Sequence, residues 1–220
     1  MRLPDPALVA DLERVLAPGR VLTRPLDRLG RSADASIYRM IPEAVVRPRG
    51  TAEIQGLLAC ARRHRRPLTF RAAGTSLSGQ AVTEGILVEL AQHWTSARVL
   101  DQGQRVWAEP GVVGGFLNKL LAPHRRRLGP DPASIDAAMM GGILANNSSG
   151  MCCGVAQNSY HTLDSLHLVL ADGTELRTGE PEADAHLRQT RPDIHQALSD
   201  LRGEIRADRA MVDRIRRRFS

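Results

Sequence analysis

The sequence predicts an α+β fold of two small subdomains, each with a small mixed sheet flanked by helices. Residues 44–90 read as strand, helix, strand, glycine-rich loop and strand, which builds one α/β layer. Residues 97–178 supply further strands around a helix. The predicted organisation is an N-terminal helix and lead-in over 1–33, subdomains over 34–95 and 96–179, and a helical segment over 180–220.

In the first half, residues 5–17 predict an amphipathic helix that ends at Pro18–Gly19. The stretch that follows reads as irregular as far as the short strand 44–48. Thr51 is predicted to cap a helix over 51–66, because apolar residues recur there at helical spacing: Ile54, Leu57, Leu58 and Ala61. Strands are expected at 67–70 and 85–90.

In the second half, strands are expected at 97–101 and 105–111, joined by a turn. A helix over 111–124 would bury one face made of Val113, Phe116, Leu117 and Leu120. Leu166, Leu168 and Leu170 alternate along a strand, and Asp172–Gly173 predicts a hairpin with a type I′ turn. Helices are expected at 194–205 and 209–219.

The composition is that of a globular protein. Of the 220 residues, 42% are hydrophobic and 25% are charged, which allows a sizeable core. No window reaches the run of about 18 apolar residues typical of a membrane helix. The N-terminus carries acidic residues and prolines where a signal peptide has an apolar region. We expect a cytoplasmic location, with any membrane contact peripheral and made through a partner.

The net charge of +6 raises the question of nucleic-acid binding. Of the 30 basic residues only Lys119 is lysine, and the arginines cluster at predicted helix ends and turns, where cations complement the helix dipole. Aromatic residues make up 3%, too few for a base-stacking platform. A nucleic-acid-binding protein therefore ranks third among the functions considered.

The three cysteines predict neither a disulfide framework nor a zinc site. Cys60 falls within a predicted helix and is expected to be buried. Cys152 and Cys153 are adjacent, and a redox or metal-binding role stays open for them. Without a CxxC spacing or a nearby histidine, packing is favoured, and no metal site is predicted.

The segment RAAGTSLSGQ, residues 71–80, follows a strand and contains almost no large apolar side chain. Gly74 and Gly79 permit positive φ and a close approach to the backbone, and successive exposed N–H groups form an anion nest. Hydroxyls and Arg71 add donors and charge. The segment is neither a Walker loop nor a GxGxxG fingerprint, so a phosphate cradle and a plain surface loop are equally favoured by these residues alone.

A second segment, GPDPASIDAAMMGGILANNSSGMCCG over 129–154, has the same character. Two such segments, each followed by a strand, indicate one extended ligand held mainly by main chain. A nucleotide with a diphosphate fits that description better than a small metabolite.

The motifs occur in the order AVVRPRGTAEI, RAAGTSLSGQA, EPG, GPDPAS…GGILANNSSG and LVLADGTEL. This set resembles the FAD-binding domain of the vanillyl-alcohol oxidase / p-cresol methylhydroxylase (PCMH) flavoproteins, within it the D-lactate, glycolate and D-2-hydroxyglutarate dehydrogenases. The resemblance covers residues 34–178. It implies a PCMH-type fold and an oxidoreductase of CH–OH donors, in which hydride passes from the α-carbon of a D-2-hydroxy acid to flavin N5.

The resemblance also implies which residues bind FAD. Amides from Ala72 to Gly79 would hold the pyrophosphate. Thr75 stands where covalently flavinylated members carry histidine, so FAD is expected to be bound non-covalently. Ala72 replaces the family's glycine and requires negative φ. The implied cofactor-binding residues are Arg71, Ala72, Ala73, Gly74, Thr75, Ser76, Leu77, Ser78, Gly79, Gln80, Pro110, Gly111, Pro132, Ser134, Met140, Gly141, Gly142, Asn146, Asn147, Ser148, Ser149, Gly150 and Val169.

Proteins of this branch continue into a substrate-binding part, whereas this sequence ends at VDRIRRRFS. The resemblance therefore predicts an N-terminal fragment that binds FAD, has no catalytic residue of its own and meets a small 2-hydroxy acid only with a C-terminal substrate domain. The second function considered is a non-catalytic FAD-binding subunit that acts with a partner chain.

Overall fold

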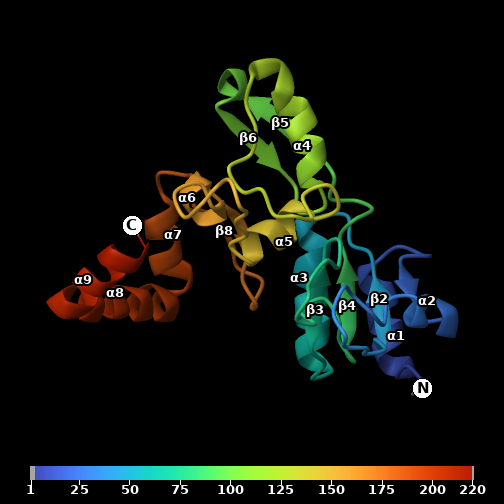
Figure 1. Cartoon of the computed structure of the whole chain (residues 1–220). Helices are drawn as coiled ribbons and strands as arrows, with labels where there is room; N and C mark the ends of the chain where they lie inside the picture. Colours follow the sequence, from blue (N-terminus) through green and yellow to red (C-terminus); the bar gives the residue numbers. More distant parts are fainter. Residues whose placement is uncertain (1–2, 220) are drawn as a thin grey trace.

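The first sheet lies at the N-terminal end of the protein, whose computed structural model describes residues 3–219 (Figure 1). Its strand order is β1 (Val21–Leu22), β2 (Ala44–Val46), β4 (Ile86–Glu89) and β3 (Leu68–Arg71). β1 runs antiparallel to β2, and β2, β4 and β3 are parallel to one another. Helix α3 (Thr51–Arg63) connects β2 with β3.

The central strands are continuous apolar runs. Every residue of β2 is buried, and so are Ile86, Leu87 and Val88 of β4, as expected for parallel strands covered on both faces. Helices α1 (Pro6–Val15) and α3 contribute Leu8, Leu12, Ile54 and Leu57 to the same core. The predicted burial of Cys60 in this helix is confirmed.

A second hydrophobic core lies in the part of the chain that rises at the top of Figure 1. The antiparallel strands β5 (Ala97–Leu100) and β6 (Arg105–Ala108) pack against α4 (Gly114–Leu121) and α5 (Met140–Ala145). Leu117 and Ile143 are its most deeply buried residues. Two short 3-10 helices belong to this part of the chain: Asp101–Gly103 connects β5 with β6, and Ala122–His124 follows α4.

The hairpin of β7 (His167–Val169) and β8 (Glu175–Arg177) returns to the first core. Val169 packs against that core, and Gln55 Nε2 on α3 donates to the carbonyl of Gly173 at 2.8 Å. The β7–β8 hairpin, predicted as part of the second subdomain, therefore rests on α3 of the first. The predicted subdomain boundaries at residues 95 and 179 stay predictions.

Three C-terminal helices extend away from both cores: α7 (Ala183–Thr190), α8 (Pro192–Ala207) and α9 (Arg209–Phe219) (Figure 1). Within the described residues, α7 and α8 have no buried residue. Of the elements described over 3–219, no helix has the length and apolar character needed to cross a bilayer.

Several local predictions were wrong. Thr51 does not cap helix α3: it is the first helical residue, and the N-cap is Gly50, which has no side chain to make a capping hydrogen bond. Phe116 is 49% exposed and Leu121 is buried in its place. The hairpin turn is not type I′, because only Gly173 has positive φ (+96°) and Asp172 does not.

Four short elements lie where no regular structure was expected. They are β1, α2 (Pro25–Leu29), α5 and α6 (Ser159–Thr162). Each is only two to six residues long, and periodicity over so few residues is too weak a signal to detect. α7 lies in the segment 180–220, which was predicted to be helical.

Candidate functional site: two glycine-rich segments between the two cores

The first glycine-rich segment leaves the carboxyl edge of the parallel sheet. β2, β3 and β4 are in register and end together near Val46, Arg71 and Glu89. Ligands of parallel sheets bind at this edge because the connecting loops open there. The segment 71–80 starts directly at the end of β3.

The backbone of this segment presents unused donors. Gly74 and Gly79 have φ of +75° and +73°. Within the described residues, no hydrogen bond uses the N–H groups of Ala72, Ala73, Gly74, Thr75, Ser76, Leu77 or Gly79. Ser76 Oγ holds the turn by accepting from the N–H groups of Ser78 (3.2 Å) and Gln80 (3.3 Å). The loop therefore forms an anion nest with most of its amides free.

Ala72, which stands where the resembled family has glycine, was expected to require a negative φ, and this expectation is met. It is not among the positive-φ residues of the described chain, so its methyl group carries no left-handed strain.

The loop rests on a support formed by residues 31–38, which the sequence analysis read as irregular. Arg71 Nη1 donates to the carbonyls of Arg31 (3.2 Å) and Ala33 (2.9 Å), and the Ala35 N–H donates to the carbonyl of Gly74 at 3.1 Å. The ring of Tyr38 lies so close to Gly79 that a Cβ there would be 2.7 Å from Cδ2. Arg71 was expected to lend charge to the ligand, which stays a prediction, and the structure adds that its guanidinium holds the loop to residues 31–33.

Asp34 joins this support to the far end of the loop. Its carboxylate accepts from the N–H groups of Ser36 (2.9 Å) and Ala81 (3.3 Å). Burial raises the pKa of Asp34, but the hydrogen bonds from Ser36 and Ala81 outweigh it and hold the pKa below its ordinary value. Asp34 is thus an ionised acceptor that fixes both the support and the loop.

A chain of backbone contacts joins this loop to the second glycine-rich segment. The Leu90 N–H donates to the carbonyl of Arg71 at 3.0 Å. Gly111 lies against Leu90, because a Cβ there would be 2.9 Å from the Leu90 carbonyl. The Gly141 N–H then donates to the carbonyl of Pro110 at 2.9 Å. Consistent with these contacts, α5 lies below the β5–β6 pair and beside the upper end of α3 (Figure 1).

The second segment is built differently from the first. Asn147 has φ of +44°, and its Oδ1 accepts from the Tyr160 N–H at 3.0 Å. The Ser148 carbonyl accepts from the hydroxyl of Ser159 at 2.8 Å. Amides of the segment are also used, since the N–H groups of Asn146 and Ser148 donate to the carbonyls of Gly142 and Ile143. The segment therefore offers a ligand exposed positions rather than a nest. These positions are Ser134, Gly142, Asn146 and Ser149.

The glycines of the second segment fall into two kinds. A Cβ on Gly141 would be 2.7 Å from Pro110 Cβ, and one on Gly150 would be 2.0 Å from the Asp131 carbonyl, so packing requires both glycines. A Cβ on Gly142 would meet no described atom within 4 Å. Gly154, at the end of the segment, is equally open, so Gly142 is the open glycine among the predicted cofactor-binding residues.

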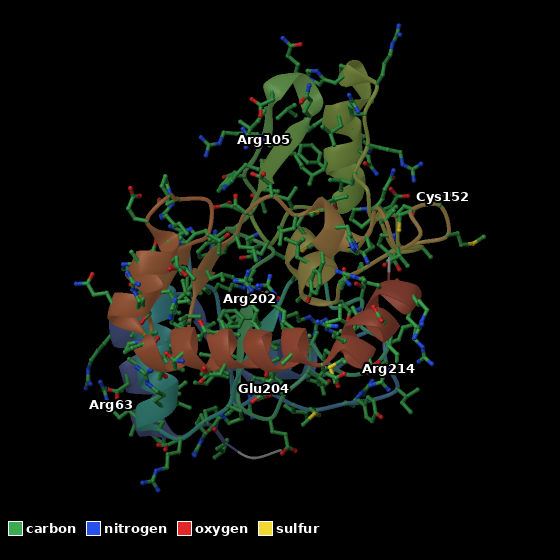
Figure 2. The ribbon with its side chains drawn as sticks, turned by 90° about the vertical axis from the view of Figure 1, so that its left-hand side faces the viewer. Arg63, Arg105, Cys152, Arg202, Glu204 and Arg214 are labelled. Atoms are coloured by element: carbon green, nitrogen blue, oxygen red, sulfur yellow. The ribbon has the colours of Figure 1, made fainter. Side chains whose placement is uncertain are left out.

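Two predicted residues lie in hydrophobic cores. Met140 is 8% exposed in the second core, and Val169 packs against the first core beside α3. The remaining predicted residues line the two segments or the Pro110–Gly111 crossing between them. Of the two adjacent cysteines at the end of the second segment, Cys152 is exposed and Cys153 is buried. Cys152 is labelled at the right of Figure 2.

A charged network at the strand ends was missed by the sequence analysis. Glu89 accepts from Arg47 Nε at 2.6 Å and from Arg31 Nε at 3.3 Å. Burial and the nearby Arg49, Arg20 and Arg47 lower the pKa of His93, which lies just beyond β4. The sequence could have indicated this network, because Arg47 and Glu89 stand near the ends of the predicted strands 44–48 and 85–90.

These features fit a diphosphate-containing cofactor. The nest supplies unpaired N–H donors, and Gly74 and Gly142 permit close approach, one through positive φ and one through open space. The long, neutral remainder of a dinucleotide matches the largely uncharged second segment.

Comparison with known proteins also indicates an FAD-binding domain. A family model described as an FAD binding domain matches residues 42–179. Glycolate oxidase subunit GlcD of Escherichia coli (strain K12) is 32% identical over 152 residues, 68% of this chain and 30% of that protein. D-2-hydroxyglutarate dehydrogenase of the same strain is 33% identical over 175 residues, 76% of this chain and 17% of that protein. GlcD of Bacillus subtilis (strain 168) is 35% identical over 157 residues, 69% of this chain and 33% of that protein.

Solved structures show the same fold. Alkyldihydroxyacetonephosphate synthase has a TM-score of 0.66 at 21% identity, covering 80% of this chain and 35% of that one. The 6-hydroxy-D-nicotine oxidase from Arthrobacter nicotinovorans has a TM-score of 0.65 at 18% identity, covering 78% and 38%. The predicted two-subdomain α+β fold is confirmed.

The chain spans about a third or less of the length of the curated relatives named above. The matched region nevertheless includes both glycine-rich segments and the β7–β8 hairpin, whereas the support at residues 31–38 lies before it. With a family model matching more than half of its residues and a fold shared with solved members, the chain belongs to the PCMH-type FAD-binding domain family.

Proposed function

We propose that this chain is the FAD-binding part of a flavin-dependent D-2-hydroxyacid dehydrogenase of the D-lactate or glycolate type. The observation that carries the proposal is the run of unpaired amides from Ala72 to Leu77, joined through Leu90, Gly111 and Gly141 to the second glycine-rich segment. The relatives named GlcD and D-2-hydroxyglutarate dehydrogenase support the substrate class.

In this proposal the chain's residues bind and orient the cofactor. Free amides of the first segment hold the diphosphate, and Arg71, Asp34 and Tyr38 keep that segment in its binding conformation. Exposed residues around Gly142 and Asn146 lie along the rest of the cofactor. FAD, when bound, supplies the electron acceptor for oxidation of the hydroxyl-bearing carbon.

We infer that the attachment is non-covalent. Thr75 stands at the loop position where a covalently linked relative would need a nucleophilic side chain, and a threonine hydroxyl does not form that bond. Cys152 and Cys153, at the end of the second segment, lie after the region in which members of the resembled class carry a cysteinyl attachment, so no covalent role is assigned to them.

The test is purification with added FAD, followed by an absorption spectrum and acid precipitation. We expect bound flavin that stays in the supernatant after precipitation and is not reduced by D-lactate, glycolate or D-2-hydroxyglutarate with this chain alone. Reduction should appear when the chain is combined with the substrate-binding part of a relative. A colourless protein at saturating FAD would refute the proposal, and flavin in the precipitate would refute non-covalent attachment.

A second candidate function is a non-catalytic FAD-binding subunit that acts with a partner chain. One observation favours it: neither glycine-rich segment contains a histidine, so neither supplies that residue as a general base. Bound flavin that remains oxidised even with the added substrate-binding part would favour this candidate over the first.

A further inference from the structure

Away from the glycine loops, three potential metal ligands converge between α1 and α3. Cys60 and His64 are four residues apart and therefore share one face at the end of α3. Asp11 reaches them from α1. One ligand atom from each residue lies within 4.8 Å of the other two, and Asp11 Oδ2 is 2.8 Å from His64 Nε2.

The cluster lies at the end of α3 opposite its junction with β2. Arg63, next to His64, marks this end at the lower left of Figure 2, far from Cys152 at the right. A ligand bound here would not meet the proposed FAD site, which lies at the other end of the parallel strands.

An ordinary ion-pair cluster explains part of this arrangement. Asp11 also pairs with Arg63 at 2.8 Å and with Arg14. Those arginine side chains are 65% and 75% exposed, so both can turn into solvent. Ion pairing does not account for the thiol, because Cys60 is only 2% exposed and points into the same cluster.

A nucleophilic Cys–His–Asp triad is a poorer explanation. Burial raises the pKa of the Cys60 thiol, and the charge of Asp11 raises it further. Reactive cysteines instead have lowered pKa values and accessible sulfur atoms.

We propose that Asp11, Cys60 and His64 bind a zinc ion that joins α1 to α3. Thiolate, imidazole and carboxylate are the ligands zinc prefers, and water would complete a tetrahedral site. The ion would insert between the Asp11 carboxylate and the His64 imidazole, replacing their hydrogen bond. Binding releases the Cys60 thiol proton to solvent, and His64 ligates through Nε2 as the neutral tautomer that carries its proton on Nδ1. The thiolate and the carboxylate together balance the 2+ charge of the ion.

The site requires small shifts of both signs: the Asp11 and His64 ligand atoms, 2.8 Å apart, must separate, and the wider pairs must close. Bonds of about 2.0–2.3 Å to a tetrahedral ion place ligand atoms roughly 3.5 Å apart, and here they already lie within 4.8 Å. The three residues belong to helices whose buried residues, including Leu8, Leu12 and Leu57, pack in one core. The expected role is structural, since the ion would lock the N-terminal helix onto that core.

The test uses the full chain after chelator treatment, titrated with Co²⁺ and then displaced by Zn²⁺. We expect one equivalent of Co²⁺ with a thiolate-to-metal charge-transfer band, and a zinc-dependent rise in Tm. His64→Gln should weaken zinc binding by more than the roughly 10–100-fold caused by losing an outer-shell partner. Cys60→Ser should remove the charge-transfer band.

The matched control is the double variant Cys152→Ser/Cys153→Ser, which should bind Co²⁺ like the parent chain. If Cys60→Ser fails to fold, His64→Gln decides, because its amide can still hydrogen-bond to Asp11. The proposal is overturned if no charge-transfer band appears, if His64→Gln binds zinc normally, or if the control variant loses the band.

Discussion

Arg71 Nη1 lies 2.9 Å from the carbonyl oxygen of Ala33, so the arginine that opens the glycine loop points beneath the loop. The same nitrogen donates to the Arg31 carbonyl at 3.2 Å. A charged side chain at this position would be expected to face a diphosphate, but here it braces the loop that holds one. The distinction can be tested with two substitutions.

Arg71→Met removes both hydrogen bonds and should lower the free energy of unfolding by about 1–3 kcal/mol. FAD affinity should fall at least about tenfold, because the loop loses its support. Arg71→Lys keeps the charge, but the lysine side chain is one atom too short to place its nitrogen where Nη1 meets both carbonyls, so it should behave like Arg71→Met. Chemical denaturation and flavin-fluorescence titration measure the two quantities.

The control is Arg188→Met, at an exposed position on α7. It should change neither stability nor FAD affinity. If Arg71→Lys instead keeps parental FAD affinity, charge rather than bracing is the contribution of Arg71.

Gly74→Ala should damage the loop itself. The residue has φ of +75°, and a Cβ would be 2.6 Å from Arg71 Nη2. The left-handed conformation alone costs a non-glycine residue about 1–2 kcal/mol, and the contact would also push the Arg71 side chain from its site. We expect lower stability together with weaker FAD binding, measured as for Arg71.

Gly142→Ala separates ligand contact from folding. A Cβ at this position meets no described atom within 4 Å, and alanine favours the helix α5 by up to about 1 kcal/mol. The protein without cofactor should therefore be as stable as the parent or more stable, whereas FAD should bind more weakly. Gly203→Ala on α8, equally open, is the matched control and should leave FAD binding unchanged. Unchanged FAD affinity in Gly142→Ala would remove this residue from the site.

The sequence was sufficient for elements whose stability is local or strongly patterned. β2, β4 and α3 were predicted because their apolar residues form continuous runs or recur at helical spacing. The glycine loop was recognised because its glycines and hydroxyl residues are typical of an anion nest and because it stands in an ordered set of motifs. Its ligand contacts stay predictions.

Elements that depend on distant partners were not predictable. α5 is six residues long and contains two glycines, and it is held by the Met140 N–H bonded to the Val112 carbonyl and by burial of Ile143. The support beneath the glycine loop exists only because residues 31–38 meet Arg71 in space. The zinc ligands show the same limit, since Cys60 and His64 are spaced on one helix but Asp11 comes from another.

Acid should weaken the ion pair between Arg20 and Glu53. The Arg20 guanidinium donates two hydrogen bonds to the Glu53 carboxylate, both at 2.6 Å. Hydrogen bonding from Arg20 lowers the pKa of Glu53 below its ordinary value of 4.5. Because the folded pKa is the lower one, the stabilisation is fully present above about pH 4.5 and is lost as the pH falls through the folded pKa. Glu53→Gln should therefore lower the free energy of unfolding by about 1–3 kcal/mol at pH 7, and by much less at pH 3.

Urea denaturation at the two pH values measures this difference. Glu180→Gln is the control, because Glu180 is exposed and lies 3.8 Å from Arg177. Its effect should stay within about 0.5 kcal/mol at both pH values. An equal loss for Glu53→Gln at pH 7 and pH 3 would show that the ionised form is not the source of the stabilisation.

Gly56→Ala sets helix propensity against packing. Alanine in the middle of α3 should gain about 1 kcal/mol over glycine. However, a Cβ on Gly56 would lie 2.7 Å from Val15 Cγ1 and 3.3 Å from Cγ2, in the contact between α1 and α3. Valine has few rotamers with which to escape, and overpacking costs about 1–3 kcal/mol. We expect Gly56→Ala to be destabilising by up to about 2 kcal/mol, and Val15→Ala/Gly56→Ala to be more stable than the sum of the single changes. If the two substitutions add without coupling in urea denaturation, α1 does not pack on α3 through this contact.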